Sequence, residues 1–434
     1  MRRNQFSDLE RWKQSAPRKP LIIWGARQVG KTWLMKEFGR TQYRKCAYVN
    51  LESNAVLRSL FTVDFDIRRI LAAVQIETGV IIDAEDTLIL FDEIQEAPGA
   101  LTCLKYFYEN APQYHVIAAG SLLGVALMGG TSFPVGKVAI LDLRPLDFLE
   151  FIEAVEGKPL VEVLKSGDWQ LITGFKTRFI ELLKQYYYVG GMPEAVYSYA
   201  HHKDFDAVRE IQRRILAGYE QDFAKHTPKD IVPRIRMLWQ SVPMQLSKEN
   251  RKFIYGLVKD GARAREYELA LNWLIDCGLI YKVNNVSKPG IPLKAYEEMS
   301  AFKLYIVDIG LMGAMAGLDI KTLIDGNELF EEFKGALTEQ YVLQQLLAKK
   351  DAFIFYWSPE GARSSVDFVV QYWGKVVPIE VKAAENLQAK SLKVYNQKYQ
   401  PRHSIRTSMS DYRKEEWMTN LPLYAIGELF NEIK

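Results

Sequence analysis

Short runs of consecutive apolar residues punctuate the first 150 positions of the chain, and each ends at a turn or a polar side chain. Three runs, residues 21–24 ("LIIW"), 88–91 ("LILF") and 115–121 ("HVIAAGS"), have the length and composition of buried strands. The first run is followed by a turn and then by a helical apolar periodicity. The pattern predicts an α/β domain with a parallel sheet.

Helical periodicity dominates the next stretch, residues 151–225. Within it, the segment "YYVGGMPEAV" predicts that one helix ends at Gly190 and Gly191 and that the next begins at Pro193. Two amphipathic patterns come later, "NRKFIYGLVKDG" and "AREYELALNWLIDCGLIYKV", with a tight turn at Gly261. They predict helix, turn, helix and then a strand over residues 279–283.

Two further patterns lie near the C-terminus. "AFKLYIVDIGLMGAM" reads as a strand that runs into a helix capped by Asp308. "FKGALTEQYVLQQLL" reads as a helix carrying Glu339, and "YWGK" as the turn of a hairpin with Asp367 on one strand. On the other strand Glu380 and Lys382 are two residues apart, so they project side by side from one face. Such groups in a half-buried sheet are costly unless they are paired or bind a metal.

The segment "LIIWGARQVGKTWLMKEF" contains the pattern GxxxxGK[ST] between a strand and a helix. Glycines let the backbone wrap around phosphate, and the N–H groups with the helix N-terminus supply positive potential. Lys31 would reach the terminal phosphates, and the Thr32 hydroxyl would bind Mg²⁺. The residues expected to bind ATP are Gly25, Arg27, Gln28, Val29, Gly30, Lys31 and Thr32.

The segment "TLILFDEIQ" ends a buried strand in two carboxylates, at the sheet edge where α/β proteins bind ligands. Asp92 fits the carboxylate on the magnesium side. Glu93 fits a general base that polarises the attacking water. Ser121, at the end of "VIAAGS", would sense the terminal phosphate or cap the next helix.

In their order, "GARQVGKT", "LILFDEIQ", "AAGSLLG", "FPVGKVAILDLRPLDFLEF" and "YYVGGMPEAV" resemble the AAA-superfamily ATPases of bacteria and archaea that carry a C-terminal domain of uncharacterised function. The resemblance implies a P-loop ATPase core in residues 1–150 and a helical lid in 151–225, with the Gly-Gly turn near the nucleotide. It also supports a winged helix in residues 226–324. The family pattern has Arg where this chain has Lys137, which leaves Arg144 as the arginine-finger candidate or as a structural salt bridge.

Glu339 on a helix, followed by Asp367 and then Glu380-x-Lys382, resembles the PD-(D/E)xK nuclease-like superfamily. The resemblance implies a restriction-endonuclease-like α/β domain over residues 325–434. In active members the carboxylates hold Mg²⁺ or Mn²⁺ and the lysine helps to activate water. Two interpretations stay open: a second metal site, or a retained ion pair in a binding domain.

Charge adds one feature to this organisation. The chain has a net charge of +3, yet residues 225–265 hold ten Lys and Arg against three Asp and Glu. A basic segment of this kind indicates an anionic partner such as DNA, while a solvated helix face or a protein-docking face gives the same pattern. The sequence leaves open whether the chain forms a homo-oligomer.

Composition narrows the class of protein. With 48% hydrophobic and 25% charged residues, the chain has the make-up of a folded protein of several domains. The three cysteines have neither paired nor metal-binding spacing, which is typical of a reducing compartment and predicts a cytoplasmic protein. Residues 116–136 carry no charge, but their glycines and Pro134 favour a strand, a loop and a short helix over a membrane span.

Three functions fit these observations. The first is a Mg²⁺-dependent ATPase that couples its nucleotide state to a DNA-associated or regulatory module. The second is an ATP-coupled, metal-dependent DNA nuclease. The third is a nucleotide-controlled switch that docks a protein partner without nucleic acid.

Overall fold

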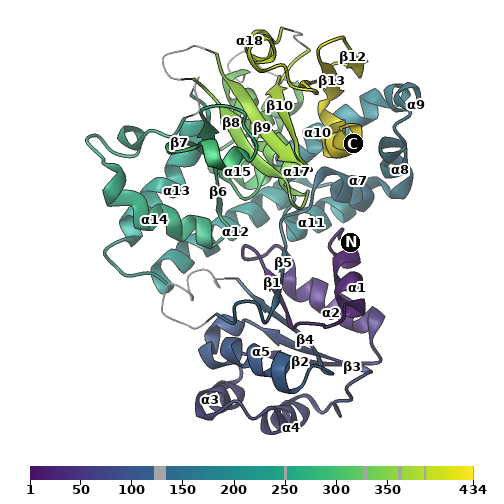
Figure 1. Ribbon diagram of the computed structural model, residues 1–434, viewed down its shortest axis with the longest axis vertical. Helices are drawn as coiled ribbons and strands as arrows, with labels where there is room; N and C mark the ends of the chain where they lie inside the picture. Colours follow the sequence, from purple (N-terminus) through teal and green to yellow (C-terminus); the bar gives the residue numbers. More distant parts are fainter. Residues whose placement is uncertain (122–132, 249–251, 326–330, 360–363, 386–387, 434) are drawn as a thin grey trace. The chain divides into compact units, whose positions relative to one another are not determined.

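The structure, a computed structural model, describes all residues except 122–132, 249–251, 326–330, 360–363, 386–387 and 434. The chain divides into two compact units (Figure 1). The N-terminal unit comprises residues 2–144 with the short segment 272–279. The C-terminal unit comprises Met1, residues 145–271 and residues 280–434.

The N-terminal unit is a five-stranded parallel sheet of order β2-β3-β4-β1-β5 with helices around it. Its strands are β1 (Leu21–Trp24), β2 (Lys45–Asn50), β3 (Thr87–Asp92), β4 (His115–Gly120) and β5 (Ala139–Asp142). Its helices are α1 (Phe6–Gln14), α2 (Lys31–Gln42), α3 (Ala55–Val63), α4 (Ile67–Thr78), the short η1 (Ile94–Glu96) and α5 (Pro98–Asn110). The predicted parallel sheet is confirmed.

Strand order places the candidate residues at one edge of this sheet. Every residue of β3 and β4 is buried, as their unbroken apolar runs predict. β4 lies between β1 and β3, so the chain emerges from three neighbouring strands at the same carboxyl edge. The loop after β1, Asp92 at the end of β3 and Ser121 after β4 therefore meet there. The short helix expected after β4 falls outside the described residues.

Helices make up the first part of the C-terminal unit. They are α7 (Phe148–Glu156), α8 (Lys158–Ser166), α9 (Trp169–Gly174), α10 (Lys176–Val189), α11 (Pro193–His202), α12 (Phe205–Lys225), α13 (Val232–Leu246) and, reaching into the segment 272–279, α14 (Ala264–Asp276). The predicted stop and restart is present, because α10 ends at Val189 and α11 begins at Pro193.

An eight-stranded mixed sheet of order β12-β13-β11-β10-β9-β8-β6-β7 forms the rest of this unit. Its strands are β6 (Ile280–Val286), β7 (Glu297–Ile306), β8 (Phe353–Trp357), β9 (Val366–Tyr372), β10 (Lys375–Val381), β11 (Ile405–Ser408), β12 (Arg413–Lys414) and β13 (Thr419–Pro422). The accompanying helices are η2 (Tyr255–Leu257), η3 (Leu293–Tyr296), α15 (Ile309–Met315), α16 (Ile320–Asp325), α17 (Glu331–Leu347), α18 (Lys390–Tyr399), η5 (Leu423–Glu428) and α19 (Leu429–Glu432).

This sheet continues across the domain boundary expected at 324/325. The hairpin of β6 and β7 belongs to the segment before that boundary, and it joins β8 through the parallel pairing of Asn285 with Tyr356. The Asn285 side chain strengthens the junction, since it accepts from Ser358 N at 2.8 Å and donates to Ser358 O at 3.1 Å. The two expected domains thus share one sheet.

The prediction of a first helix in the expected helix-turn-helix pair is wrong. Residues 252–254 are not helical, and only the short η2 follows. Phe253 N donates to Phe302 O of β7 at 2.8 Å, and the Gln245 side chain bonds both the N–H and the C=O of Ile254. These partners replace helical hydrogen bonds in a segment that Gly256 already weakens as a helix. The second helix, α14, and the strand after it are present as expected.

The Gly-Gly turn is anchored by a buried aspartate. Asp308 caps α15 as predicted, accepting from Leu311 N at 3.1 Å, and its other oxygen accepts from Gly191 N at 2.6 Å. Gly190 has a φ of +71°, and a Cβ there would lie 2.1 Å from the Asp308 carboxylate. Burial raises the pKa of Asp308. Within its own unit, therefore, the turn packs on α15.

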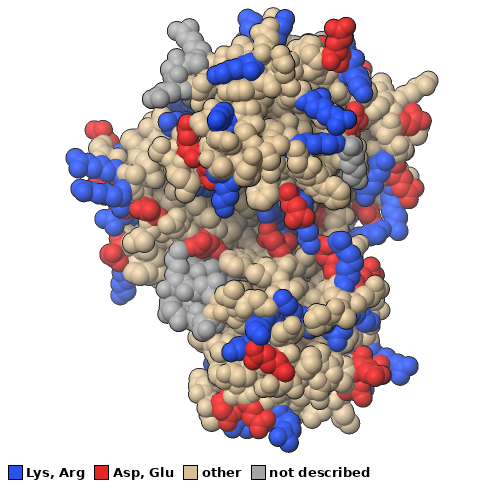
Figure 2. Space-filling view, in the orientation of Figure 1, with Lys and Arg blue, Asp and Glu red and all other residues tan. Residues whose placement is uncertain are grey.

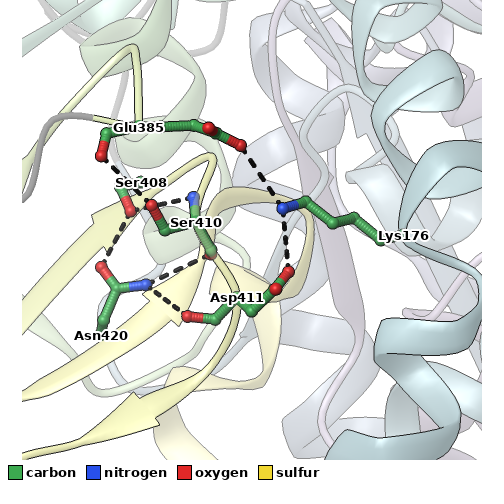
Figure 3. A network of polar contacts seen from close by, with 6 residues as sticks. All are labelled: Lys176, Glu385, Ser408, Ser410, Asp411 and Asn420. Atoms are coloured by element: carbon green, nitrogen blue, oxygen red, sulfur yellow. Dashed lines mark hydrogen bonds and ion pairs between the residues drawn. The ribbon is translucent and has the colours of Figure 1, made fainter.

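A polar network joins α10 to the loops at the end of the large sheet (Figure 3). Lys176 lies 3.0 Å from Asp411 and 3.4 Å from Glu385, and the Asp411 carboxylate raises the pKa of this lysine. Asn420 holds the loop by donating to the carbonyls of Ser410 and Asp411 at 3.2 and 2.8 Å. Lys176 thus connects the helical segment to the last strands, which belong to the same compact unit.

Candidate nucleotide site and C-terminal carboxylate cluster

The loop between β1 and α2 has the backbone of an anion-binding nest. Gln28 and Gly30 adopt φ values of +67° and +92°, and Gly30 directly precedes the first helical residue. Left-handed residues followed by a helix N-terminus turn successive N–H groups toward one side. Val29 is fully buried and anchors the loop, whereas Arg27 and Gln28 are exposed.

Lys31 lies beneath this loop. Its Nζ donates to the carbonyls of Gly25 at 2.9 Å and Ala26 at 2.7 Å, and the side chain is 7% exposed. Burial lowers the pKa of Lys31 to about 8, against the opposing effect of the Glu93 and Asp92 carboxylates. The ammonium is held where phosphate oxygens would replace carbonyls as acceptors.

Thr32 and Asp92, sixty positions apart in sequence, are in direct contact. The Thr32 hydroxyl donates to Asp92 Oδ2 at 2.7 Å, and Glu93 N donates to Asp92 Oδ1 at 3.1 Å. Tyr48 of β2, which sequence reasoning missed, also donates to Asp92 Oδ2, at 2.9 Å. Burial and the Asp92 carboxylate raise the pKa of Tyr48, so it stays a hydrogen-bond donor. Asp92 is thus fixed in position by three donors.

Glu93 and Ser121 also meet at this edge. Glu93 has a φ of +51°, which turns its side chain off the end of β3. Its Oε2 accepts from Gln95 Nε2 at 2.6 Å and faces Ser121 Oγ at 3.4 Å. The carboxylate is half-buried and held in one orientation, which is what a water-activating base requires.

The donor set fits a nucleotide-bound magnesium ion. Mg²⁺ is commonly held by one or two protein oxygens together with substrate phosphates and water. The Thr32 hydroxyl and the Asp92 carboxylate supply two such oxygens beside the loop. Across the described ranges, no group of three or more His, Cys, Asp or Glu is arranged to hold a metal by itself.

Arg3 is a second residue that sequence reasoning missed. It is 3% exposed, and its guanidinium donates to Val29 O of the loop at 3.0 Å and to Arg144 O at 2.5 Å. Because a trans peptide points its C=O and N–H in opposite directions, a fixed Val29 carbonyl also fixes the Gly30 N–H. Arg3 therefore positions an amide of the phosphate nest, and nothing local in "MRRNQF" signals this role.

We expect Arg3→Ala to weaken binding of ATP and ADP roughly tenfold, the effect of losing one well-placed hydrogen bond to a charged group. Equilibrium titration with a fluorescent ADP analogue measures this loss. Arg2→Ala is the matched control, because Arg2 is the exposed neighbour. Equal affinities for Arg3→Ala and Arg2→Ala would show that Arg3 has no part in the phosphate nest.

The arginine-finger candidate is engaged in a local ion pair. Arg144 lies 2.7 Å from Asp142, two residues earlier, which is the salt bridge considered for it from sequence. Lys137, where the family pattern has Arg, lies 2.9 Å from Glu109.

The structure brings three of the four C-terminal candidates together. Lys382 Nζ lies 2.8 Å from Glu380 Oε1, and Asp367 Oδ2 accepts from Val381 N at 2.8 Å. Glu380 is 5% exposed. Burial and the nearby Asp367 carboxylate raise its pKa, while Lys382 opposes them. Glu380 and Lys382 thus form an ion pair.

Glu339 is paired with a buried lysine of β7. It is fully buried on α17, and its Oε1 accepts from Lys303 Nζ at 2.9 Å and from the Tyr305 hydroxyl. Lys303 is 2% exposed and also lowers the pKa of Glu380, so its ammonium acts on both carboxylates. Lys303 of β7 thus supplies positive charge beside the carboxylates that the resemblance to nucleases predicted to bind a metal ion. Sequence reasoning missed both Lys303 and Tyr305, because no local pattern links them to Glu339.

Three family models match successive parts of the chain. Residues 17–152 match the family model described as an AAA domain. Residues 180–322 and 334–426 each match a model described as a domain of unknown function, DUF8612 and DUF4143 respectively. The AAA match and the parallel sheet with its loop support a P-loop ATPase. No curated protein matches the chain.

Solved structures give distant likenesses. The Walker-type ATPase PABY2304 of Pyrococcus abyssi is 17% identical with a TM-score of 0.45, over 73% of this chain and 95% of that one. The ORC1 protein of Aeropyrum pernix, in complex with DNA, is 13% identical with a TM-score of 0.28, over 73% and 93%. Likenesses at these scores carry no inference about function. Among the described helices, none combines the length and apolarity needed to cross a membrane.

Proposed function

We propose that the chain is a Mg²⁺-dependent ATPase whose nucleotide site lies at the carboxyl edge of the N-terminal sheet. The observation that carries this proposal is the 2.7 Å contact between Thr32 and Asp92, which joins the P-loop to the acidic end of β3. The two oxygens would bind Mg²⁺ together with the β- and γ-phosphates.

The remaining residues take complementary roles. Lys31 would exchange its carbonyl partners for the terminal phosphates, while Arg27, Gln28 and the loop amides surround them. Glu93 would accept the proton of the attacking water, and Ser121 beside it would contact the terminal phosphate.

Metal dependence tests this proposal. ATP hydrolysis by the full chain, followed as phosphate release, is expected to require Mg²⁺ and to stop on addition of EDTA. Asp92→Asn is expected to raise the Mg²⁺ concentration needed for half-maximal activity. Glu96→Gln, a nearby half-buried acid, serves as the control. Hydrolysis that persists in EDTA would refute the assignment of Thr32 and Asp92.

Nucleic acid is the partner we propose for the basic segment, which makes the chain a DNA-associated or regulatory ATPase. Its cations are largely exposed to solvent, as phosphate binding requires. Those classed as exposed are Lys225, Lys229, Arg236, Lys248, Lys252, Lys259, Arg263 and Arg265. Figure 2 shows that Lys and Arg are interspersed with Asp and Glu over the visible face.

For the C-terminal cluster we propose a structural or binding role in preference to cleavage of DNA. Lys303 and Lys382 already neutralise Glu339 and Glu380 at 2.9 and 2.8 Å. Each buried carboxylate thus already has a cationic partner of the kind that a buried charge requires. A nucleotide-controlled protein-docking switch would use the same ATPase chemistry with a different partner.

A further inference from the structure

An unusual residue forms the tip of the hairpin between β9 and β10. Tyr372 pairs with Lys375, so Trp373 and Gly374 are the two loop residues, with φ values of +48° and +72°. Positive φ at both positions is the type I′ turn, for which Asn-Gly is the preferred pair. A bulky residue at the first position is sterically strained.

Trp373 is also exposed to water. It is 82% exposed, although indole is among the most apolar side chains and usually becomes largely buried. Its ring centroid lies 5.9 Å from that of the adjacent Tyr372. Strain and exposure both oppose folding, and residues held in this way commonly serve a function outside the fold.

Cations and aromatic rings surround the tip. Tyr372 packs against Phe430 at 4.8 Å, and Lys349 Nζ lies 5.7 Å from the Tyr372 centroid and 5.9 Å from that of Phe430. Lys375, the next residue after the turn, donates to the Ile433 carbonyl at 2.5 Å. Lys349 and Lys375 thus both lie beside Tyr372, the residue that precedes the exposed indole.

Further cations lie toward the same edge of the sheet. Strand β11 runs parallel to β10 with Ile405 opposite Ile379, so Arg402, just before β11, lies toward the edge where β10 begins. Lys414 pairs with Thr419, which lies opposite Ile405, and so belongs to the same edge. In agreement, Lys375, Arg402 and Lys414 add to burial in lowering the pKa of His403. Arg402 and Lys414 are exposed. An acid, Glu432, is also close, but its carboxylate accepts from the Tyr412 hydroxyl at 2.8 Å.

We infer that the hairpin tip is a binding site for single-stranded nucleic acid, in which a base stacks on Trp373 and phosphates contact Lys349, Lys375, Arg402 and Lys414. An exposed aromatic ring among cations is the arrangement by which proteins hold unpaired strands without sequence preference. A duplex hides its base faces, so the ring favours a single strand. None of these residues belongs to the candidate nucleotide site or to the basic segment, residues 225–265.

Fluorescence anisotropy of the full chain with labelled oligothymidylate tests the inference. We expect saturable binding that weakens as salt rises. Trp373→Asn should weaken it roughly fivefold or more, the effect of losing one base stack. Asn suits the turn better than Trp, so this variant should melt no lower than wild type, which excludes misfolding as the cause. Trp33→Ala, which removes another exposed tryptophan on α2, is the control.

Three outcomes would overturn the inference. The first is that wild type does not bind oligothymidylate. The second is that Trp373→Asn binds oligothymidylate as tightly as wild type. The third is that Trp373→Asn loses binding of polyglutamate or of duplex DNA while keeping that of oligothymidylate, which would assign the tip to an acidic protein or to a duplex.

Discussion

Replacement of Lys31 by alanine is expected to abolish ATP binding at cellular nucleotide concentrations. The ammonium donates two hydrogen bonds to loop carbonyls and would donate to phosphates instead. A hydrogen bond to a charged group contributes about 1.5–3 kcal/mol, so loss of two lowers affinity roughly 100-fold or more. Titration with a fluorescent ATP analogue measures this, with the exposed Lys45→Ala as control. An unchanged affinity of Lys31→Ala for ATP would refute the assignment of this loop as a nucleotide site.

The lowered pKa of Lys31 predicts that the affinity for ATP depends on pH. Its pKa is lowered to about 8 by burial, so the ammonium loses its proton as pH rises through that value. ATP affinity of the wild type should therefore fall above about pH 8. Lys31→Arg, whose side chain stays charged, should not show this fall. A flat wild-type profile from pH 7 to pH 10 would contradict the role given to the ammonium.

Glu93→Gln is expected to bind ATP about as tightly as the wild type while losing turnover by roughly 10²- to 10⁴-fold. The amide keeps an oxygen for Gln95 and Ser121 but cannot take a proton from water. Single-turnover hydrolysis with radiolabelled ATP separates this chemical step from binding. Hydrolysis at the wild-type rate in Glu93→Gln would assign the base to another residue.

The candidate nucleotide site could be predicted from sequence because each of its parts is a local pattern. Each part is a strand end followed by a fixed set of polar residues, and parallel strands bring their carboxyl ends to one edge. Thr32 and Asp92 were assigned to the same ion on this ground, and their side chains are 2.7 Å apart.

Residues that act across long distances in sequence were not predictable in this way. Arg3 contacts Val29 and Arg144, and Lys303 contacts Glu339, through pairings that only the folded chain defines. Tyr48 reaches Asp92 because β2 lies beside β3, and strand order has no local signature.

The failed helix at residues 250–261 has a related cause. Its amphipathic periodicity is real, but the backbone at Phe253 pairs with β7 and Gln245 caps Ile254. Tertiary hydrogen bonds outweigh a weak local propensity in such a segment. The hairpin at "YWGK" was predicted, whereas the exposure and strain of Trp373 came only from the structure.

Calorimetric titration of the full wild-type chain with a hydrolysis-resistant ATP analogue, with Mg²⁺ and then with EDTA, tests the central claim most directly. The account predicts saturable binding at a single site per chain that tightens with Mg²⁺, because Thr32 and Asp92 would share the ion with the phosphates. Absence of saturable binding in the presence of Mg²⁺ would contradict it.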